Sequence, residues 1–212
     1  MKFLSIVLLT LSLSACGVAQ KAQYSALEKF GIHKRDVLVD RIEKTTQSQE
    51  QTKVQFQSAY EELASLVSVG DQGLEKKYKK MASAVSKSES KANELKDRIA
   101  SVDRVANDLF EEWQQEITQY KSENLRTASQ NNLATTKQRY ATIYRKMQES
   151  SAKVDPVLRV LQDNTMYLKH NLNARTVSGL SSEVLDIENK VRDLIAQMEA
   201  SINESKTFIN SL

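Results

Sequence analysis

Residues that break helices are scarce in this sequence. Five glycines and one proline occur among 212 residues, while Glu, Lys, Gln, Ala, Ser and Leu are plentiful. Most of the plentiful residues have a high intrinsic helix propensity, whereas glycine and proline are the poorest helix formers. The composition therefore predicts long helices.

Cysteine is nearly absent too, since Cys16 is the only one. It follows a positively charged Lys2, an apolar run over residues 3–13 and the small residues Ser14 and Ala15. This order is typical of a bacterial lipoprotein signal peptide, and the apolar run is too short to span a bilayer. We therefore expect residues 1–15 to be removed and Cys16 to be acylated. An acylated Cys16 leaves no thiol for a disulfide bond or for cysteine catalysis.

The acyl groups on Cys16 are expected to hold the chain in a membrane, because several acyl chains anchor a protein stably where one binds only marginally. Gly17 stands where an inner-membrane retention signal usually places Asp. We therefore expect an outer-membrane protein that faces the periplasm.

A strong charge of one sign is also lacking. The 30 Lys and Arg residues, less Lys2 of the signal peptide, stand against 27 Asp and Glu residues. A chain so close to neutrality gives no reason to expect a nucleic-acid partner.

A heptad pattern begins near Asp36, after a tether of residues 16–35, and predicts a helix over about residues 36–68. The middle of its apolar stripe is polar, so this helix either packs weakly there or holds a buried polar layer. Two glycines around Asp71 then predict a turn. The stripe consists of Leu38, Ile42, Thr45, Gln49, Thr52, Phe56, Ala59, Leu63 and Leu66.

The longest stripe predicts a second helix over about residues 74–121. Apolar positions run out after it, so residues 121–132 are expected to form a solvated tip where the chain reverses. The stripe consists of Leu74, Tyr78, Met81, Val85, Ser88, Ala92, Leu95, Ile99, Val102, Ala106, Leu109, Trp113, Glu116 and Tyr120.

A third helix is predicted over about residues 125–172, with Pro156 inside it. Proline removes a backbone donor and clashes with the preceding turn. Either the helix kinks near residues 151–155, or it breaks and Asp155 caps a new helix. The stripe consists of Leu133, Thr136, Tyr140, Ile143, Met147, Ser150, Val154, Val157, Leu161, Thr165, Leu168 and Leu172.

The heptad phase slips near Gly179, and a last helix is predicted over about residues 181–211, with Ser181 or Ser182 as its N-cap. Its stripe consists of Leu180, Val184, Ile187, Val191, Leu194, Met198, Ser201, Ser205, Phe208 and Leu212.

These four helices and their polar turns predict an all-α fold. Short connections make sequential helices antiparallel, so we expect one elongated up-down bundle over residues 36–212. The alternative is an extended coiled coil that buries its stripes only in a homo-oligomer. Polar residues at core positions weaken the contact between any two helices. Both the bundle and the oligomeric coiled coil therefore need all their helices packed together to be stable.

Residues with the spacing of an active site are not found. His33 and His170 are far apart and have no HxxxH or ExxH spacing, and there is no glycine-rich phosphate loop or GxSxG motif. We therefore expect a non-enzymatic protein without a metal or cofactor.

Polar clusters are the remaining candidate sites. His33, Lys34 and Arg35 form either a basic collar that touches lipid phosphate or an ordinary polar helix start. The cluster at residues 169–175 is either a recognition surface, a buried polar network or a helix end that satisfies its own carbonyls. Its polar members are Lys169, His170, Asn171, Asn173 and Arg175.

Three further features are candidates for an interaction. The lysines at residues 76–80 form either a solvated helix face or an anion-binding patch. Trp113 lies on the core stripe, where packing is its commonest role. At the expected tip, Glu123, Leu125 and Arg126 are the residues expected to contact a partner, some tens of ångströms from the anchored end.

The chain resembles a family of small bacterial envelope lipoproteins that is described only as a domain of unknown function. The resemblance rests on YSALEKFGIHKRDVLVDRIEK at residues 24–44, on MYLKHNLNARTVSGL at residues 166–180 and on the preceding lipoprotein signal. It implies a helical, coiled-coil-rich fold and implies no activity.

The sequence thus leads to two functional hypotheses. The first is a lipid-anchored periplasmic scaffold or adaptor that binds an envelope protein or the cell wall. The second is a membrane-surface protein that binds or reshapes anionic lipid through its basic clusters.

Overall fold

The computed structural model describes residues 33–67 and 73–212, and within them it contains helices and no strand. The helices are α2 (Lys34–Val67), α3 (Leu74–Ile117), α4 (Glu123–Ala152), α5 (Val154–His170), α6 (Ala174–Ser178) and α7 (Ser181–Ile209). The predicted all-α fold is confirmed. The signal peptide, Cys16, the tether up to residue 32 and most of the turn around Asp71 lie outside the described residues.

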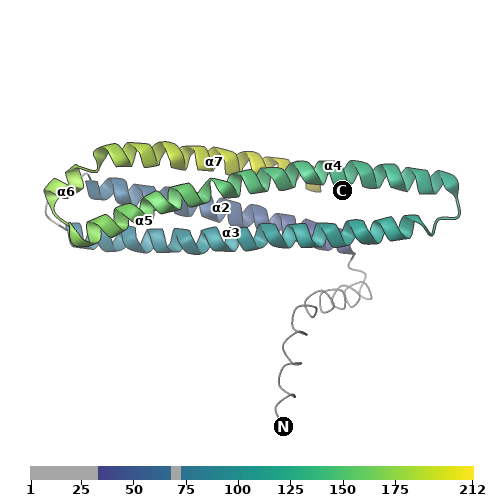
Figure 1. The fold of residues 1–212 in the computed structure, drawn as a ribbon, viewed down its shortest axis with the longest axis horizontal. Helices are drawn as coiled ribbons and strands as arrows, with labels where there is room; N and C mark the ends of the chain where they lie inside the picture. The colour runs from purple at the N-terminus through teal and green to yellow at the C-terminus, as the bar shows by residue number, and fades with distance from the viewer. Residues whose placement is uncertain (1–32, 68–72) are drawn as a thin grey trace, which may run out of the picture.

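The helices form an elongated up-down bundle, in which α4 and α5 together make one long arm (Figure 1). Helix α2 packs against α3 and α7, and the α4–α5 arm packs against the same two helices from the other side. At about 1.5 Å per residue, the 44 residues of α3 extend over about 66 Å. None of the helices in the described part of the chain is long and apolar enough to cross a membrane.

The predicted stripes form the core. All nine positions predicted on α2 are fully buried, and most of those predicted on the other helices are buried. The prediction for α3 is wrong at its far end, where Glu116 and Tyr120 are exposed and Phe110 and Ile117 are buried instead. A straight helix drifts by about 20° per heptad, so a strict heptad pattern leaves the buried face of a long helix.

The polar middle of α2 forms a buried layer. The Gln49 amide nitrogen donates to the hydroxyls of Ser150 on α4 (3.0 Å) and Ser201 on α7 (2.9 Å). Gln49, Ser150 and Ser201 are all fully buried, and the amide oxygen of Gln49 has no partner. Of the two alternatives for this segment, the structure shows the buried polar layer, which links three helices at one level of the bundle.

Pro156 bends the long arm without ending its helical path. The regular helix is interrupted at Lys153, whose backbone nevertheless stays right-handed helical (φ −75°, ψ −17°). Pro156 is the third residue of α5, and the Asp155 carboxylate pairs with Lys96 at 2.7 Å instead of capping a helix. Since Val154 and Val157 remain buried, the heptad phase continues through the proline.

Helix α7 begins without the predicted serine cap. Its N-cap is Leu180, and the Ser181 hydroxyl donates to the Ser178 carbonyl at 2.8 Å. The short α6 lies immediately upstream, so Ser181 satisfies the end of α6 and is not free to cap α7.

An aromatic cluster joins α3, α4 and α7 near the C-terminal end of α7. The Tyr140 ring lies edge-on to Phe110 (5.4 Å between centroids), stacks with Tyr144 (5.7 Å) and contacts Phe208 (6.4 Å). Its hydroxyl donates to the Asp103 carboxylate at 3.0 Å. Burial, and then the negative charge of Asp103, raise the pKa of Tyr140 well above its ordinary value.

This shift predicts a loss of stability at alkaline pH. The unfolded chain releases the Tyr140 proton near pH 10, whereas the folded chain retains it, so the unfolded state binds fewer protons above that pH. The stability that Tyr140 contributes is therefore complete below about pH 10 and declines by up to about 1.4 kcal/mol per pH unit above it. Urea unfolding at pH 8 and pH 11 should show a smaller decline for Tyr140→Phe than for the unaltered chain. An equal decline would contradict the assignment to Tyr140.

Candidate interaction surfaces

The two ends of the bundle differ in what they carry. Helix α2 begins at Lys34, whose ammonium lies 3.1 Å from Glu112 near the end of α3. The chain therefore arrives from Cys16 at the same end as the α3–α4 hairpin, and we call this the proximal end (Figure 1). The distal end carries the end of α2, the start of α3 and α6 (Figure 1). From Tyr78 to Glu112, α3 rises about 50 Å.

The hairpin projects beyond the rest of the bundle at the proximal end (Figure 1). The chain reverses within residues 118–122, and α4 begins at Glu123, so most of the predicted tip is helical although it is exposed. The prediction that this tip lies far from the start of the first helix is wrong. Helix α3 has 44 residues and α2 has 34, so their antiparallel pairing places the excess length of α3 beside the start of α2.

Two of the predicted tip residues have a structural role. The Arg126 guanidinium lies 3.2 Å from the Glu123 carboxylate and donates to the Tyr120 carbonyl at 3.4 Å. These contacts hold the turn closed. Leu125 is different, because its side chain is 59% exposed and is available to a partner or a membrane.

The cluster at residues 169–175 lies at the distal end. Asn173 caps α6 by accepting from the Thr176 amide at 3.0 Å, and Asn171 donates to the Tyr167 carbonyl at 2.9 Å. These two residues therefore fit the hypothesis of a helix end that satisfies its own backbone. Lys169, His170 and Arg175 are exposed, and the exposed apolar residues Met166 and Tyr167 precede them on α5. This part of the cluster can contact a partner.

The basic collar at residues 33–35 is less basic than the sequence suggests. The side chain of Lys34 is mostly covered and pairs with Glu112, and Arg35 lies 3.8 Å from Asp36. The His33 backbone amide donates to the Asp36 carboxylate at 3.3 Å. The collar therefore behaves largely as a helix start whose charges are matched within the bundle.

Trp113 lies at the edge of the core and is not fully inside it. Its indole nitrogen donates to the Ser129 hydroxyl on α4 at 2.9 Å. Together with Leu109 and Leu212, it lines a cleft of about 380 Å³ at the proximal end. The predicted packing role holds for one side of the ring, and the other side borders this cleft.

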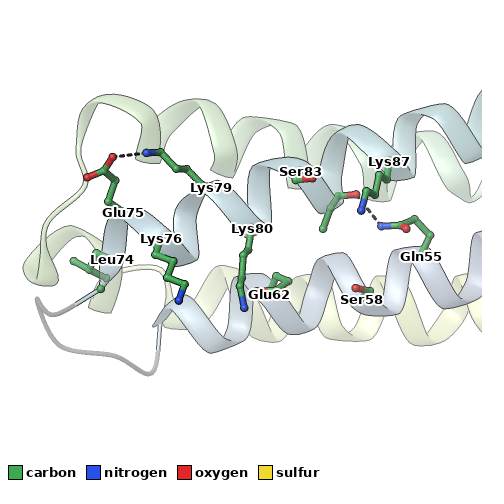
Figure 2. A pocket seen from close by; sticks show the side chains of 12 residues that line it. Gln55, Ser58, Glu62, Leu74, Glu75, Lys76, Lys79, Lys80, Ser83 and Lys87 are labelled. Carbon is green, nitrogen blue, oxygen red and sulfur yellow. Dashed lines mark hydrogen bonds and ion pairs between the residues drawn. The ribbon is translucent and has the colours of Figure 1, made fainter.

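Lys77 of the predicted lysine cluster at residues 76–80 donates to the Ser65 carbonyl at 2.8 Å. The other three lysines, Lys76, Lys79 and Lys80, form one wall of an open groove of about 960 Å³ between α2 and α3 (Figure 2). We call it the lysine groove. Its lysines are Lys76, Lys79, Lys80 and Lys87 from α3, and Gln55, Ser58 and Glu62 from α2 form the opposite wall. The sequence pattern did not show that residues of α2 and Lys87 also line this groove. The heptads specify the buried face of each helix and not which outer faces of two helices lie side by side.

The charges in the lysine groove are only partly matched. Lys79 lies 2.6 Å from Glu75, and this hydrogen bond holds the pKa of Glu75 below its ordinary value. Lys76, Lys80 and Lys87 have no carboxylate at ion-pair distance within the described part of the chain. Many other basic residues of the bundle form pairs one helical turn apart, such as Lys44 with Asp40. The groove therefore concentrates uncompensated positive charge.

Metal ligands do not come together in residues 33–67 and 73–212, where no three His, Cys, Asp or Glu side chains form a group that could hold an ion. His33 directly precedes α2 and His170 ends α5, and the start of α2 and the end of α5 lie at opposite ends of the bundle (Figure 1).

Comparison with known proteins gives a family and no activity. Residues 23–212 match the model of a family described as "Protein of unknown function (DUF2959)", so the chain belongs to that family. No curated protein and no solved structure is significantly similar to the chain.

Proposed function

We propose that this family member is a non-enzymatic, lipid-anchored scaffold or adaptor of the bacterial envelope. Acylated Cys16 would hold it in the outer membrane, with the bundle in the periplasm. The lipoprotein signal in residues 1–16 supports the anchor, and the match of the family model from residue 23 onward supports treating the remaining chain as one unit.

The observation that carries this proposal is the separation of the two ends. The tether joins the bundle at the proximal end, while the lysine groove and the exposed residues Lys169, His170 and Arg175 lie at the distal end. A continuous core runs between the two ends. Such a rod would present its distal surfaces about 50 Å from the point where the tether enters.

The same geometry bears on the alternative, a membrane-surface protein that binds anionic lipid through two basic clusters. The collar at residues 33–35 and the lysine groove are at opposite ends, so an upright bundle cannot bring both to one membrane. Lys34 is also occupied by Glu112. These contacts favour the adaptor.

Photo-crosslinking in intact cells tests the proposal. A photoreactive residue would replace Tyr167 at the distal end, Leu125 at the hairpin tip, or the exposed Val54 on α2 as a control. We expect the probe at Tyr167 to capture one discrete protein or cell-wall fragment, and the control to capture none. Cys16→Ser should abolish palmitate incorporation and the distal adduct together. Adducts with lipid or with a second copy of the chain from every site would contradict the adaptor and favour a self-assembling membrane-surface protein.

A further inference from the structure

We infer that the lysine groove binds a linear anionic polysaccharide. The inference rests on the proposed function for the setting, an envelope rich in such polymers, and it names the class of partner. The first argument is the spacing of the lysines. Lys76, Lys80, Ser83 and Lys87 follow one another at intervals of four, three and four residues, so they lie on one face of α3. They form a row about 16 Å long that follows the groove.

The opposite wall of the groove carries uncharged hydrogen-bonding groups beside the carboxylate of Glu62. Gln55 donates its amide to the Ala84 carbonyl across the groove at 2.9 Å, so its amide oxygen is left to accept from a ligand (Figure 2). Ser58 from α2 and Ser83 from α3 add two hydroxyl groups to the lining. Hydroxyl and amide groups can each pair with the hydroxyl groups of a sugar. A row of ammonium groups facing a wall whose single lining carboxylate is Glu62 matches a chain of sugars that carries acid groups along one side.

The start of α3 adds to the positive potential at one end of the row. Its N-cap is Gly73, which has no side chain to accept from the amides of the first turn. Gly73 adopts φ +81°, a left-handed conformation that favours glycine over residues with better capping side chains. The amides of the first turn and the helix dipole therefore reinforce the attraction of Lys76 for an anion.

A membrane fits this groove less well than a polymer strand. The lysines line a concave channel, whereas a bilayer presents a broad surface. None of the exposed large apolar side chains lines the groove, so nothing there would insert among lipid chains. The groove also lies beside the start of α3, which is at the end of the bundle away from the start of α2.

The carboxylates of Glu62 and Glu75 line the groove, and Glu62 leads to a prediction about the affinity for an anionic ligand. Glu75 is neutralised by Lys79, which leaves Glu62 as the lining carboxylate without an ion pair in the described part of the chain. An anionic strand in the groove would be repelled by Glu62. Glu62→Gln should therefore tighten binding by about twofold, an effect that a partly unfolded variant could not produce.

The test measures binding of a fluorescent oligogalacturonate to the purified full chain in neutral detergent, by anisotropy at low and high salt. The triple variant Lys76→Gln, Lys80→Gln, Lys87→Gln should bind about tenfold more weakly than the unaltered chain. The matched control removes the same charge from exposed lysines outside the groove and outside the cluster at residues 169–175, in Lys121→Gln, Lys137→Gln, Lys206→Gln, and should bind as the unaltered chain does. High salt should weaken binding, because exposed charges are screened.

Three results would overturn the inference. The first is equal affinity of the groove variant and the unaltered chain, and the second is an equal loss in both triple variants. The third is displacement of the oligomer by soluble short-chain phosphatidylglycerol at the same charge concentration, which would make the ligand a lipid headgroup. If the oligomer binds but no distal adduct forms in cells, the adaptor proposal alone is contradicted. If a distal adduct forms in cells but the oligomer does not bind, the assignment of the groove alone is contradicted.

Discussion

Gln49→Ala is expected to lower the free energy of unfolding by about 2–4 kcal/mol. The substitution removes both hydrogen bonds of the buried amide, to Ser150 and Ser201, and leaves a cavity where three helices meet. The Ser201 hydroxyl would be left buried without the donor it now has. Urea unfolding followed by circular dichroism, at a fixed protein concentration, measures the change.

Gln49→Met is the matched control, because it keeps the volume of the side chain and removes its polar atoms. The Gln49 amide oxygen has no partner, and burying such a group costs free energy that methionine avoids. We therefore expect Gln49→Met to stay within about 1 kcal/mol of the unaltered chain. If both variants lose the same stability, the polar layer itself would be the stabilising feature, and the argument from the cavity would be wrong.

Tyr140→Ala is expected to cost about 3–5 kcal/mol. The ring contacts Phe110 on α3 and Phe208 on α7, so its removal would weaken the packing of α3, α4 and α7 next to the α3–α4 hairpin. Trp113 lies one turn from Phe110 and is the only tryptophan of the chain, so its fluorescence reports on this end. The midpoint of urea unfolding should fall by both fluorescence and circular dichroism.

Tyr140→Phe separates the ring from its hydroxyl. It keeps the aromatic contacts and removes the hydrogen bond to the Asp103 carboxylate, which should cost about 1.5–3 kcal/mol. If Tyr140→Phe were as destabilising as Tyr140→Ala, the ring contacts would contribute nothing. If it were without effect, the hydroxyl would not be bonded to Asp103 in solution.

The sequence allowed the exposure of candidate site residues to be predicted where a local rule applies, and did not allow contacts between helices to be predicted. The exposure of Lys169, His170 and Leu125 follows from polar or unpatterned local sequence. The roles of Glu123 and Arg126 in closing the turn, and of Asn173 as a helix cap, depend on where the chain reverses. The reversal between α3 and α4 was predicted at residues 121–132, whereas it lies at residues 118–122. No Gly or Pro marks its position in the sequence.

The heptads by themselves determined the helical content and most of the core positions, because the spacing of apolar residues dictates which face of a helix avoids water. They left open whether the polar stretch around Gln49 is buried, which the packing of α2 against α4 and α7 decided. Only the tertiary structure decided which surfaces lie together. The lysine groove needs the outer faces of α2 and α3, and the place of the hairpin at the proximal end follows from the unequal lengths of these antiparallel helices. Periodicity describes the buried face of each helix, whereas the proposed function depends on the exposed faces, which no core pattern constrains.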